Sequence, residues 1–221
     1  MTTSTLTNLR EVGGPGLQVG RPRTVFRSNT EPGVDADAYP TSLSAVVDLR
    51  RDDELDAVPH PLRDSAGYRS VPLFDPSEVE TADMSAPLEA QYLDWLVRHR
   101  GTIAEVFRTL SGTPGDVLVC CSAGKDRTGV VSALLARLWG ADLDRVGADY
   151  GATADALAER FARERSVAEQ SGPEAARISR IMQRCVPEVA VHVVEQVEER
   201  YGSVRGYLRW IGLSDREVDR L

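Results

Sequence analysis

Residues 119–129 read VCCSAGKDRTG and join a short apolar run to an apolar helical pattern. Within this segment, Cys121 and Arg127 are separated by five residues. That spacing allows a tight loop to wrap a tetrahedral oxyanion while the sulfur of the cysteine points at its centre. The backbone N–H groups from Ser122 to Thr128 can turn inward, and the following helix adds the positive end of its dipole. The segment therefore predicts a strand, an anion-binding loop and a helix, in that order.

Two side chains of this loop, those of Arg127 and Cys121, are suited to catalysis. The planar guanidinium of Arg127 can bind two phosphate oxygens at once. A helix N-terminus, inward N–H groups and a nearby arginine all favour the thiolate of a cysteine. The Cys121 thiolate can then attack phosphorus in line, and water can hydrolyse the phosphocysteine without a metal ion or cofactor. The predicted phosphate-binding residues are Ser122, Ala123, Gly124, Lys125, Asp126, Arg127 and Thr128.

Three other interpretations of the loop fit its residues less well. A buried, inert cysteine beside an incidental arginine is common in protein cores, but here the residues occur in the order that the reaction requires. A Walker-type nucleotide loop does not fit, because Asp126 follows Gly124-Lys125 and Val119 occupies the position of the first glycine. Cys120 is separated from Arg127 by six residues, so its register is wrong for a nucleophile. We expect Cys120 to be a buried structural thiol.

Composition limits the classes of protein to which the chain can belong. Its 221 residues suit one domain, 1–221. A net charge of −8 and a pI near 5.0 disfavour binding to nucleic acid. No basic start leads into an apolar stretch, and no run has the length of a membrane span, so we predict a cytoplasmic protein, with leaderless secretion left open. The cysteines and histidines show no metal-ligand spacing, which predicts no metal site.

Hydrophobic patterning predicts an α/β fold with a mainly parallel central sheet, flanking helices and a helical C-terminal part. Residues 1–22 are rich in Gly, Thr and Pro, which indicates an extended N-terminal segment. The predicted strands are Ala45–Leu49, Tyr68–Phe74 and Asp116–Cys120. The predicted helices are 88–110 with a bend at Gly101, Thr128–Trp139 with a cap at Gly140, 144–168, 174–185, 187–200 and a short pair within 203–220.

The sequence CSAGKDRTG resembles the cysteine-based protein tyrosine phosphatase superfamily. More narrowly, it is similar to bacterial tyrosine and dual-specificity phosphatases whose loop reads HCxAGKDRTG, some of which also hydrolyse phosphoinositides. Similar segments extend over nearly the whole chain: Asn8–Gly14, Phe26–Ser28, Val47–Arg50, Asp149–Tyr150 and Tyr201–Ser203. The resemblance implies a protein-tyrosine-phosphatase-like fold and hydrolysis of phosphate monoesters, most simply by a tyrosine or dual-specificity protein phosphatase.

One residue departs from the family pattern. The histidine that usually precedes the nucleophile is here Cys120. The family's imidazole helps to hold the loop and favours the thiolate. We therefore expect weaker stabilisation of the Cys121 thiolate in this chain, without loss of function.

The resemblance also implies a general acid, because the family supplies an aspartate from a loop after an upstream strand. Asp75 follows the predicted strand that ends at Phe74 and is our first choice. Asp-Pro also opens turns without any catalytic role. Asp126, inside the loop, is the rival: it can be the acid, or it can orient Arg127 and the attacking water.

The substrate is less closely defined. Lys125 either contacts a further substrate phosphate, as the resemblance to phosphoinositide-hydrolysing members suggests, or is a solvated lysine paired with Asp126 or Asp48. A phosphoprotein, a phosphoinositide and a small phosphorylated metabolite all fit. A catalytically impaired phosphate-binding module and a sulfur-transfer enzyme are the remaining classes. Residues 144–200 form a helical region, in which the charged stretch 159–169 is either a solvated helix face or part of a lid over the site. The sequence does not indicate an oligomeric state.

Overall fold

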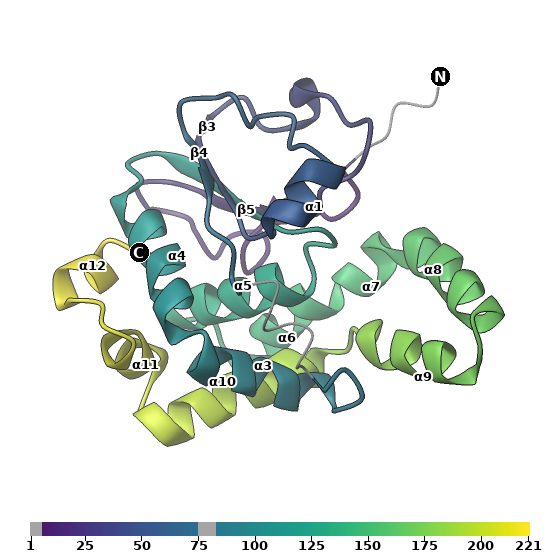
Figure 1. The fold of residues 1–221 in the computed structure, drawn as a ribbon. Coiled ribbons are helices and arrows are strands. Elements are labelled where there is room, and N and C mark those ends of the chain that lie inside the picture. Colours follow the sequence, from purple (N-terminus) through teal and green to yellow (C-terminus); the bar gives the residue numbers. More distant parts are fainter. Residues whose placement is uncertain (1–5, 75–82) are drawn as a thin grey trace.

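The structure of the chain, a computed structural model, describes residues 6–74 and 83–221. Within these residues the chain forms a five-stranded sheet with the order β1-β2-β5-β3-β4 (Figure 1). Neighbouring strands are parallel except β1 and β2, which are antiparallel. The strands are β1 Arg10–Glu11, β2 Val25–Ser28, β3 Leu43–Asp48, β4 Tyr68–Ser70 and β5 Asp116–Cys120. The α/β class and the mainly parallel sheet are confirmed.

Three of these strands were expected from the sequence and two were not. β3, β4 and β5 match the predicted apolar runs, although β4 ends at Ser70 and not at Phe74. β1 and β2 fall in segments that the prediction left without strands. β2 is short and contains Arg27, whose charge hides the strand pattern. Arg27 is nevertheless completely buried, and its Nη1 and Nη2 atoms donate to Asp149 and to the Gly124 carbonyl.

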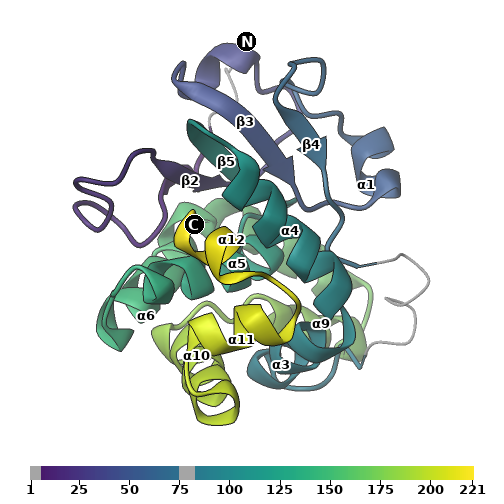
Figure 2. The same cartoon turned by 90° about the vertical axis from the view of Figure 1, so that its left-hand side faces the viewer.

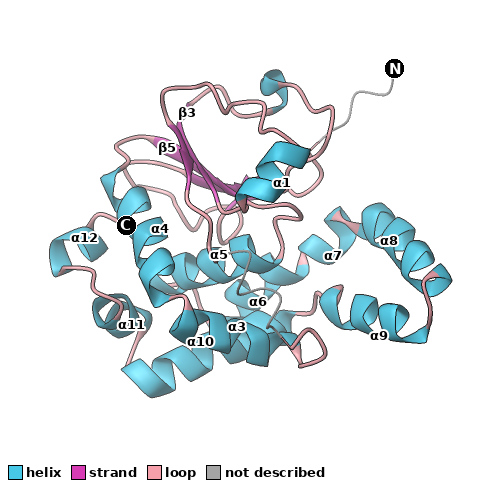
Figure 3. Cartoon of the chain, in the orientation of Figure 1, coloured by secondary structure: helices cyan, strands magenta, loops and turns pink. Residues whose placement is uncertain are grey.

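Helices fill most of the remaining chain, and every element after β5 is helical (Figure 3). Before β5 the helices are η1 Ala36–Ala38, α1 Asp52–Ala57, α3 Leu88–Arg98 and α4 Arg100–Gly112. After it they are α5 Asp126–Leu138, α6 Leu143–Gly151, α7 Thr153–Ala156, α8 Ala158–Gln170, α9 Pro173–Met182, α10 Pro187–Tyr201, α11 Val204–Trp210 and α12 Asp215–Asp219.

Two helix predictions need correction. The break in 88–110 lies at His99, which ends α3 and precedes α4, while Gly101 lies inside α4. The single helix predicted over 144–168 is three helices, because the chain leaves helical geometry at Leu157 and turns at Ala152. Apolar periodicity alone does not register such turns, since Leu157 is an apolar residue that stays buried at the break.

The two faces of the sheet are covered differently. Val117 and Val119 of β5 belong to the large core, which the helices complete. Leu118 and Cys120 alternate with them and join a smaller cluster that includes Tyr39. Figure 2 shows α5, α6, α10 and α11 on the same side of the sheet. Among the described residues, no helix has both the length and the apolar character that crossing a bilayer requires.

Candidate active site

The loop predicted to bind phosphate connects β5 to α5 at the carboxyl edge of the sheet. Gly124 forms its turn with a φ of +64°, in the left-handed region that side chains disfavour. A Cβ atom at Gly124 would also lie 2.4 Å from the carbonyl oxygen of Ser28, at the end of β2. The position therefore needs glycine for two independent reasons, and the loop packs tightly against β2.

The carbonyl groups of this loop point away from its centre. Those of residues 120–124 accept hydrogen bonds of 2.8 to 3.2 Å from Leu49 N, Thr30 Oγ1, Thr30 N, Asn8 Nδ2 and Arg27 Nη2. Because the C=O and N–H of a trans peptide group point in opposite directions, the next N–H groups turn inward. Among the described residues, no acceptor faces the N–H groups of 122–125. The loop is thus an anion-binding nest at the N-terminus of α5.

Ion pairs with a buried aspartate fix the position of the arginine that binds the loop. Asp149 on α6 accepts from Arg27 Nη1 at 2.7 Å and from Arg10 Nε at 2.8 Å. Although burial opposes ionisation, these two guanidinium groups lower the pKa of Asp149. Arg27 in turn donates to the Gly124 carbonyl at 2.8 Å. Three of the segments that resemble the phosphatase family, which contain Arg10, Arg27 and Asp149, therefore meet behind the loop.

Arg127 is held by a residue that the sequence analysis did not single out. Its Nη1 and Nη2 atoms donate to the two oxygens of Glu54 at 2.6 and 2.7 Å. Burial opposes the charge of Arg127, but the bonds to Glu54 raise its pKa. Glu54 lies on α1, directly after the strand that ends in Asp48. The charged cluster at residues 50–54 was the only signal that could have pointed to it.

Cys121 lies at the bottom of a cavity of about 360 Å³ and is only 2% exposed. Residues from the loop, from α1 and from the α8–α9 hairpin border this cavity. The hydroxyl of Thr128, in the first turn of α5, is buried and has no partner among the described residues. It is therefore free to donate to an anion at the base of the loop. The structure thus brings together Cys121, Arg127, Asp126 and the loop amides, as the sequence predicts.

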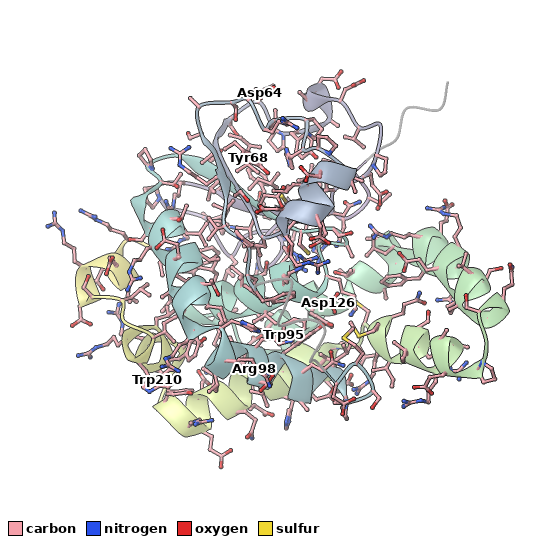
Figure 4. The ribbon with its side chains drawn as sticks, viewed as in Figure 1. Asp64, Tyr68, Trp95, Arg98, Asp126 and Trp210 are labelled. Carbon is pink, nitrogen blue, oxygen red and sulfur yellow. The ribbon has the colours of Figure 1, made fainter. Side chains whose placement is uncertain are left out.

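Asp126 and Lys125 point into different surroundings from those expected of a solvated pair. The Lys125 side chain is 1% exposed, and its Nζ donates to Asp126 Oδ1 at 2.6 Å and to the Met182 carbonyl at 2.8 Å. Asp126 Oδ1 also accepts from the Tyr92 hydroxyl. Figure 4 shows Asp126 between the sheet and the helices beneath it. The alternative of a solvated Lys125 is wrong, whereas its pairing with Asp126 is confirmed.

Asp75, the first choice for the acid, lies outside the described residues. Phe74, the residue before it, is buried and its ring centroid lies 5.5 Å from the guanidinium carbon of Arg127. The ring also packs against Trp95 of α3. The chain therefore passes directly beside Arg127 just before Asp75.

Cys120 lies on the opposite side of β5, in a buried cluster with Asp48 and His60. The ligand atoms of these three residues all lie within 4.8 Å of one another, so the fold joins a histidine and a cysteine that the sequence keeps apart. A metal ion does not fit them well. Leu62 N donates to His60 Nδ1 at 3.0 Å, which places the proton on Nε2, and Asp48 is occupied by Arg50 and by Tyr68. Burial raises the pKa of Cys120 and keeps it a thiol.

Comparisons with known proteins agree with this geometry. The sequence model of a tyrosine phosphatase family matches residues 1–221. The triple specificity protein phosphatase PtpB of Mycobacterium tuberculosis is 30% identical over 210 aligned residues, which cover 86% of this chain and 74% of that protein. A tyrosine-protein phosphatase of Nostoc commune is 27% identical over 222 aligned residues, covering 90% of this chain and 74% of that protein.

Proposed function

This chain belongs to the tyrosine phosphatase family, and we propose that it hydrolyses phosphate monoesters through a phosphocysteine formed on Cys121. The outward carbonyls of residues 120–124 are the observation that carries the proposal, because they aim the loop amides at one point above the nucleophile. An anion bound at that point meets the guanidinium of Arg127, once that group shares its N–H donors between Glu54 and phosphate.

The reaction has two steps. In the first, the Cys121 thiolate attacks phosphorus, the P–S bond forms, and the bond to the leaving oxygen breaks as an acid protonates that oxygen. In the second, water attacks phosphorus, a base takes its proton, and the P–S bond breaks to release phosphate and the thiolate. The loop amides and Arg127 stabilise the charge on the equatorial oxygens in both steps.

We propose separate roles for the two aspartates. Asp126 Oδ1 accepts from both Lys125 and Tyr92, which hold its side chain beside the loop. Because Asp126 lies next to Arg127 in the loop that would carry the phosphocysteine, it is our candidate for the base of the second step. Asp75 directly follows Phe74 in the chain, and the ring of Phe74 lies beside Arg127. Asp75 is therefore our candidate for the acid of the first step.

This division of roles is tested with two leaving groups. Asp75→Asn should lower turnover of an alkyl phosphate about 10²-fold and turnover of p-nitrophenyl phosphate much less, because nitrophenolate leaves without a proton. Asp126→Asn should affect both substrates alike, since both form the same phosphocysteine. If Asp126→Asn is the variant that discriminates between the leaving groups, the roles are reversed.

For the substrate, we propose phosphotyrosine and phosphoserine or phosphothreonine side chains of proteins. Phosphoinositides are the second class to test, because the loop resembles that of phosphatases some of which also hydrolyse phosphoinositides. A small phosphorylated metabolite is the third. A direct contact between Lys125 and a further phosphate would require the ammonium to leave Asp126 and Met182. If the lysine only positions Asp126, Lys125→Ala should therefore lower the turnover of all substrates by a similar factor. If the lysine binds the phosphates of inositol lipids, the variant should lower the turnover of those lipids selectively.

We further propose that residues 1–221 act as one phosphatase domain in which α8 and α9 form a lid. Phe161 and Ala176 are the buried residues of these two helices. Figure 1 shows the hairpin projecting beside α7. Its residues border the cavity above Cys121, which supports a role of this hairpin in controlling entry. A reducing compartment such as the cytoplasm suits an enzyme whose nucleophile has to stay a free thiol.

Hydrolysis of p-nitrophenyl phosphate tests the proposed chemistry. Activity should persist in EDTA, stop with vanadate and disappear in Cys121→Ser. Cys120→Ser is the matched control, because it makes the same change at the neighbouring position and should retain activity. Full activity in Cys121→Ser, or a loss confined to Cys120→Ser, would show that the wrong thiol has been assigned.

A further inference from the structure

Arg160 on α8 reaches the loop that holds the nucleophile. Its Nη1 donates to the Ser122 carbonyl at 3.1 Å and its Nη2 to Ser122 Oγ at 3.1 Å. Both contacts are to the residue that directly follows Cys121. Because Arg160 joins Thr30 N in holding the Ser122 carbonyl outward, it also helps to aim the next amide, Ala123 N–H, into the loop.

The guanidinium of Arg160 binds two carboxylates as well as the loop. It lies 2.8 Å from Glu164 and 3.4 Å from Glu31, with its side chain 22% exposed. Burial opposes its charge, while Glu164, Glu31 and the Cys121 thiolate raise the pKa of Arg160. The attraction between a guanidinium and a thiolate is mutual, so a cation that gains from the thiolate also stabilises it.

We propose that Arg160 is a positioning residue that brings a second cation to the Cys121 loop and stabilises the thiolate whenever α8 lies against the loop. This proposal deepens the proposed function and rests on Cys121 being the nucleophile. It also supplies a compensation for Cys120, since the position before the nucleophile carries a thiol and no cationic imidazole. The lid helix and the ionisation of the nucleophile are thereby linked through one side chain.

Most of the other charged groups around Cys121 are paired with one another and not with Arg160. Those that border the same cavity are Glu54 of α1, Lys125 before α5, Asp126 and Arg127 of α5, and Glu164 of α8. Arg127 is paired with Glu54, and Lys125 with Asp126. Glu164 is paired with Arg160 itself. Removing Arg160 therefore leaves the other two pairs in place, removes one cation from the cavity and takes that cation away from Glu164.

The test measures alkylation of Cys121 by iodoacetamide across a range of pH, with the modified peptide identified by mass spectrometry. A neutral reagent is used so that the charge of the variant does not attract or repel it. Arg160→Ala should raise the pH midpoint of alkylation by about one unit. Arg163→Ala is the matched control, because Arg163 is an exposed arginine on the same helix, and its midpoint should equal that of the wild type.

Arg160→Lys sharpens the result. It keeps the cation but loses the two-point contact with Ser122, so its midpoint should fall between those of wild type and Arg160→Ala. It also carries the test if Arg160→Ala does not fold. A midpoint in Arg160→Ala equal to that of the wild type overturns the proposal, even if turnover falls, because such a fall would reflect substrate contact or lid position alone.

The two proposals fail in different ways. Alkylation does not require turnover, so a wild-type chain that alkylates at Cys121 but hydrolyses no phosphate monoester would defeat the proposed function and leave the midpoint comparison readable. Normal hydrolysis with an unchanged midpoint in Arg160→Ala would defeat only the role of Arg160.

Discussion

Two neighbouring thiols at the end of β5 are both buried, but they lie on opposite faces of the sheet among different neighbouring groups. Cys121 faces the cavity, with inward amides, the N-terminus of α5 and the guanidinium of Arg127 around it. Cys120 faces the buried cluster with Asp48 and His60, where a carboxylate is nearby and burial raises the pKa of the Cys120 thiol. The comparison teaches that the reactive thiol is selected by its neighbours and not by its residue type.

Among the substitutions on the face of the sheet that carries Cys121, we expect Arg127→Lys to have the largest effect on activity. Lysine keeps the positive charge but cannot bind Glu54 and two phosphate oxygens with a planar fork. We expect kcat/KM for p-nitrophenyl phosphate to fall about 10³-fold. The free energy of unfolding should change much less, which urea denaturation can check. A loss of less than tenfold would show that charge alone explains the role of Arg127.

On the opposite face, His60 should govern stability and leave catalysis unchanged. Burial lowers the pKa of His60 from 6.5 to about 4, so the folded protein holds the imidazole neutral where the unfolded chain binds a proton. The contribution of the buried, neutral His60 to the free energy of unfolding is fully present above pH 6.5. It is lost as the pH falls toward 4, by up to about 1.4 kcal/mol per pH unit.

Urea denaturation between pH 4 and 7 measures this effect. In His60→Gln, the free energy of unfolding should no longer show the decrease between pH 6.5 and 4 that His60 causes. His192 is exposed, so His192→Gln should keep that decrease. Turnover above pH 6.5 should be nearly the same in all three proteins. A large loss of turnover in a well-folded His60→Gln protein would mean that the two faces are coupled, contrary to the comparison.

Glu54→Gln tests how much the ion pair between Glu54 and Arg127 contributes to turnover. The change removes the charge while keeping the size of the side chain, and we expect about a tenfold fall in kcat/KM. Asp53→Asn is the matched control, because Asp53 is an exposed acid of the same short helix and pairs with Arg51. Equal effects from the two variants would indicate a change in net charge and not in the position of Arg127.

The sequence predicted the catalytic loop better than its supports. The order of strand, loop and helix at residues 116–139 was correct because spacing, glycine turn and apolar helix all lie within one short segment. The family membership inferred from it is confirmed by the family match. β2 was missed because Arg27 interrupts its apolar pattern, although tertiary contacts bury that guanidinium completely.

Partners distant in sequence could not be predicted in the same way. Glu54 binds Arg127, Arg160 binds Ser122, and Asp149 acts on the loop only through Arg27. These three residues lie on different helices, and no local pattern records which carboxylate or guanidinium will meet the loop or its supports. The same holds for His60, which tertiary folding alone brings beside Cys120. Lys125 was placed in the correct loop, but its burial against Met182 depends on where α9 ends.

The central claim, that Cys121 carries the phosphate, is tested most directly by trapping the intermediate. Cys120→Ser protein, in which Cys121 is the remaining thiol of the pair, is mixed with p-nitrophenyl phosphate, denatured within milliseconds and analysed by peptide mass spectrometry. We predict that the peptide containing Cys121 gains the mass of one HPO₃ group during turnover. Continued turnover with that group on a different residue, or with no phosphorylated peptide at all, would contradict the account.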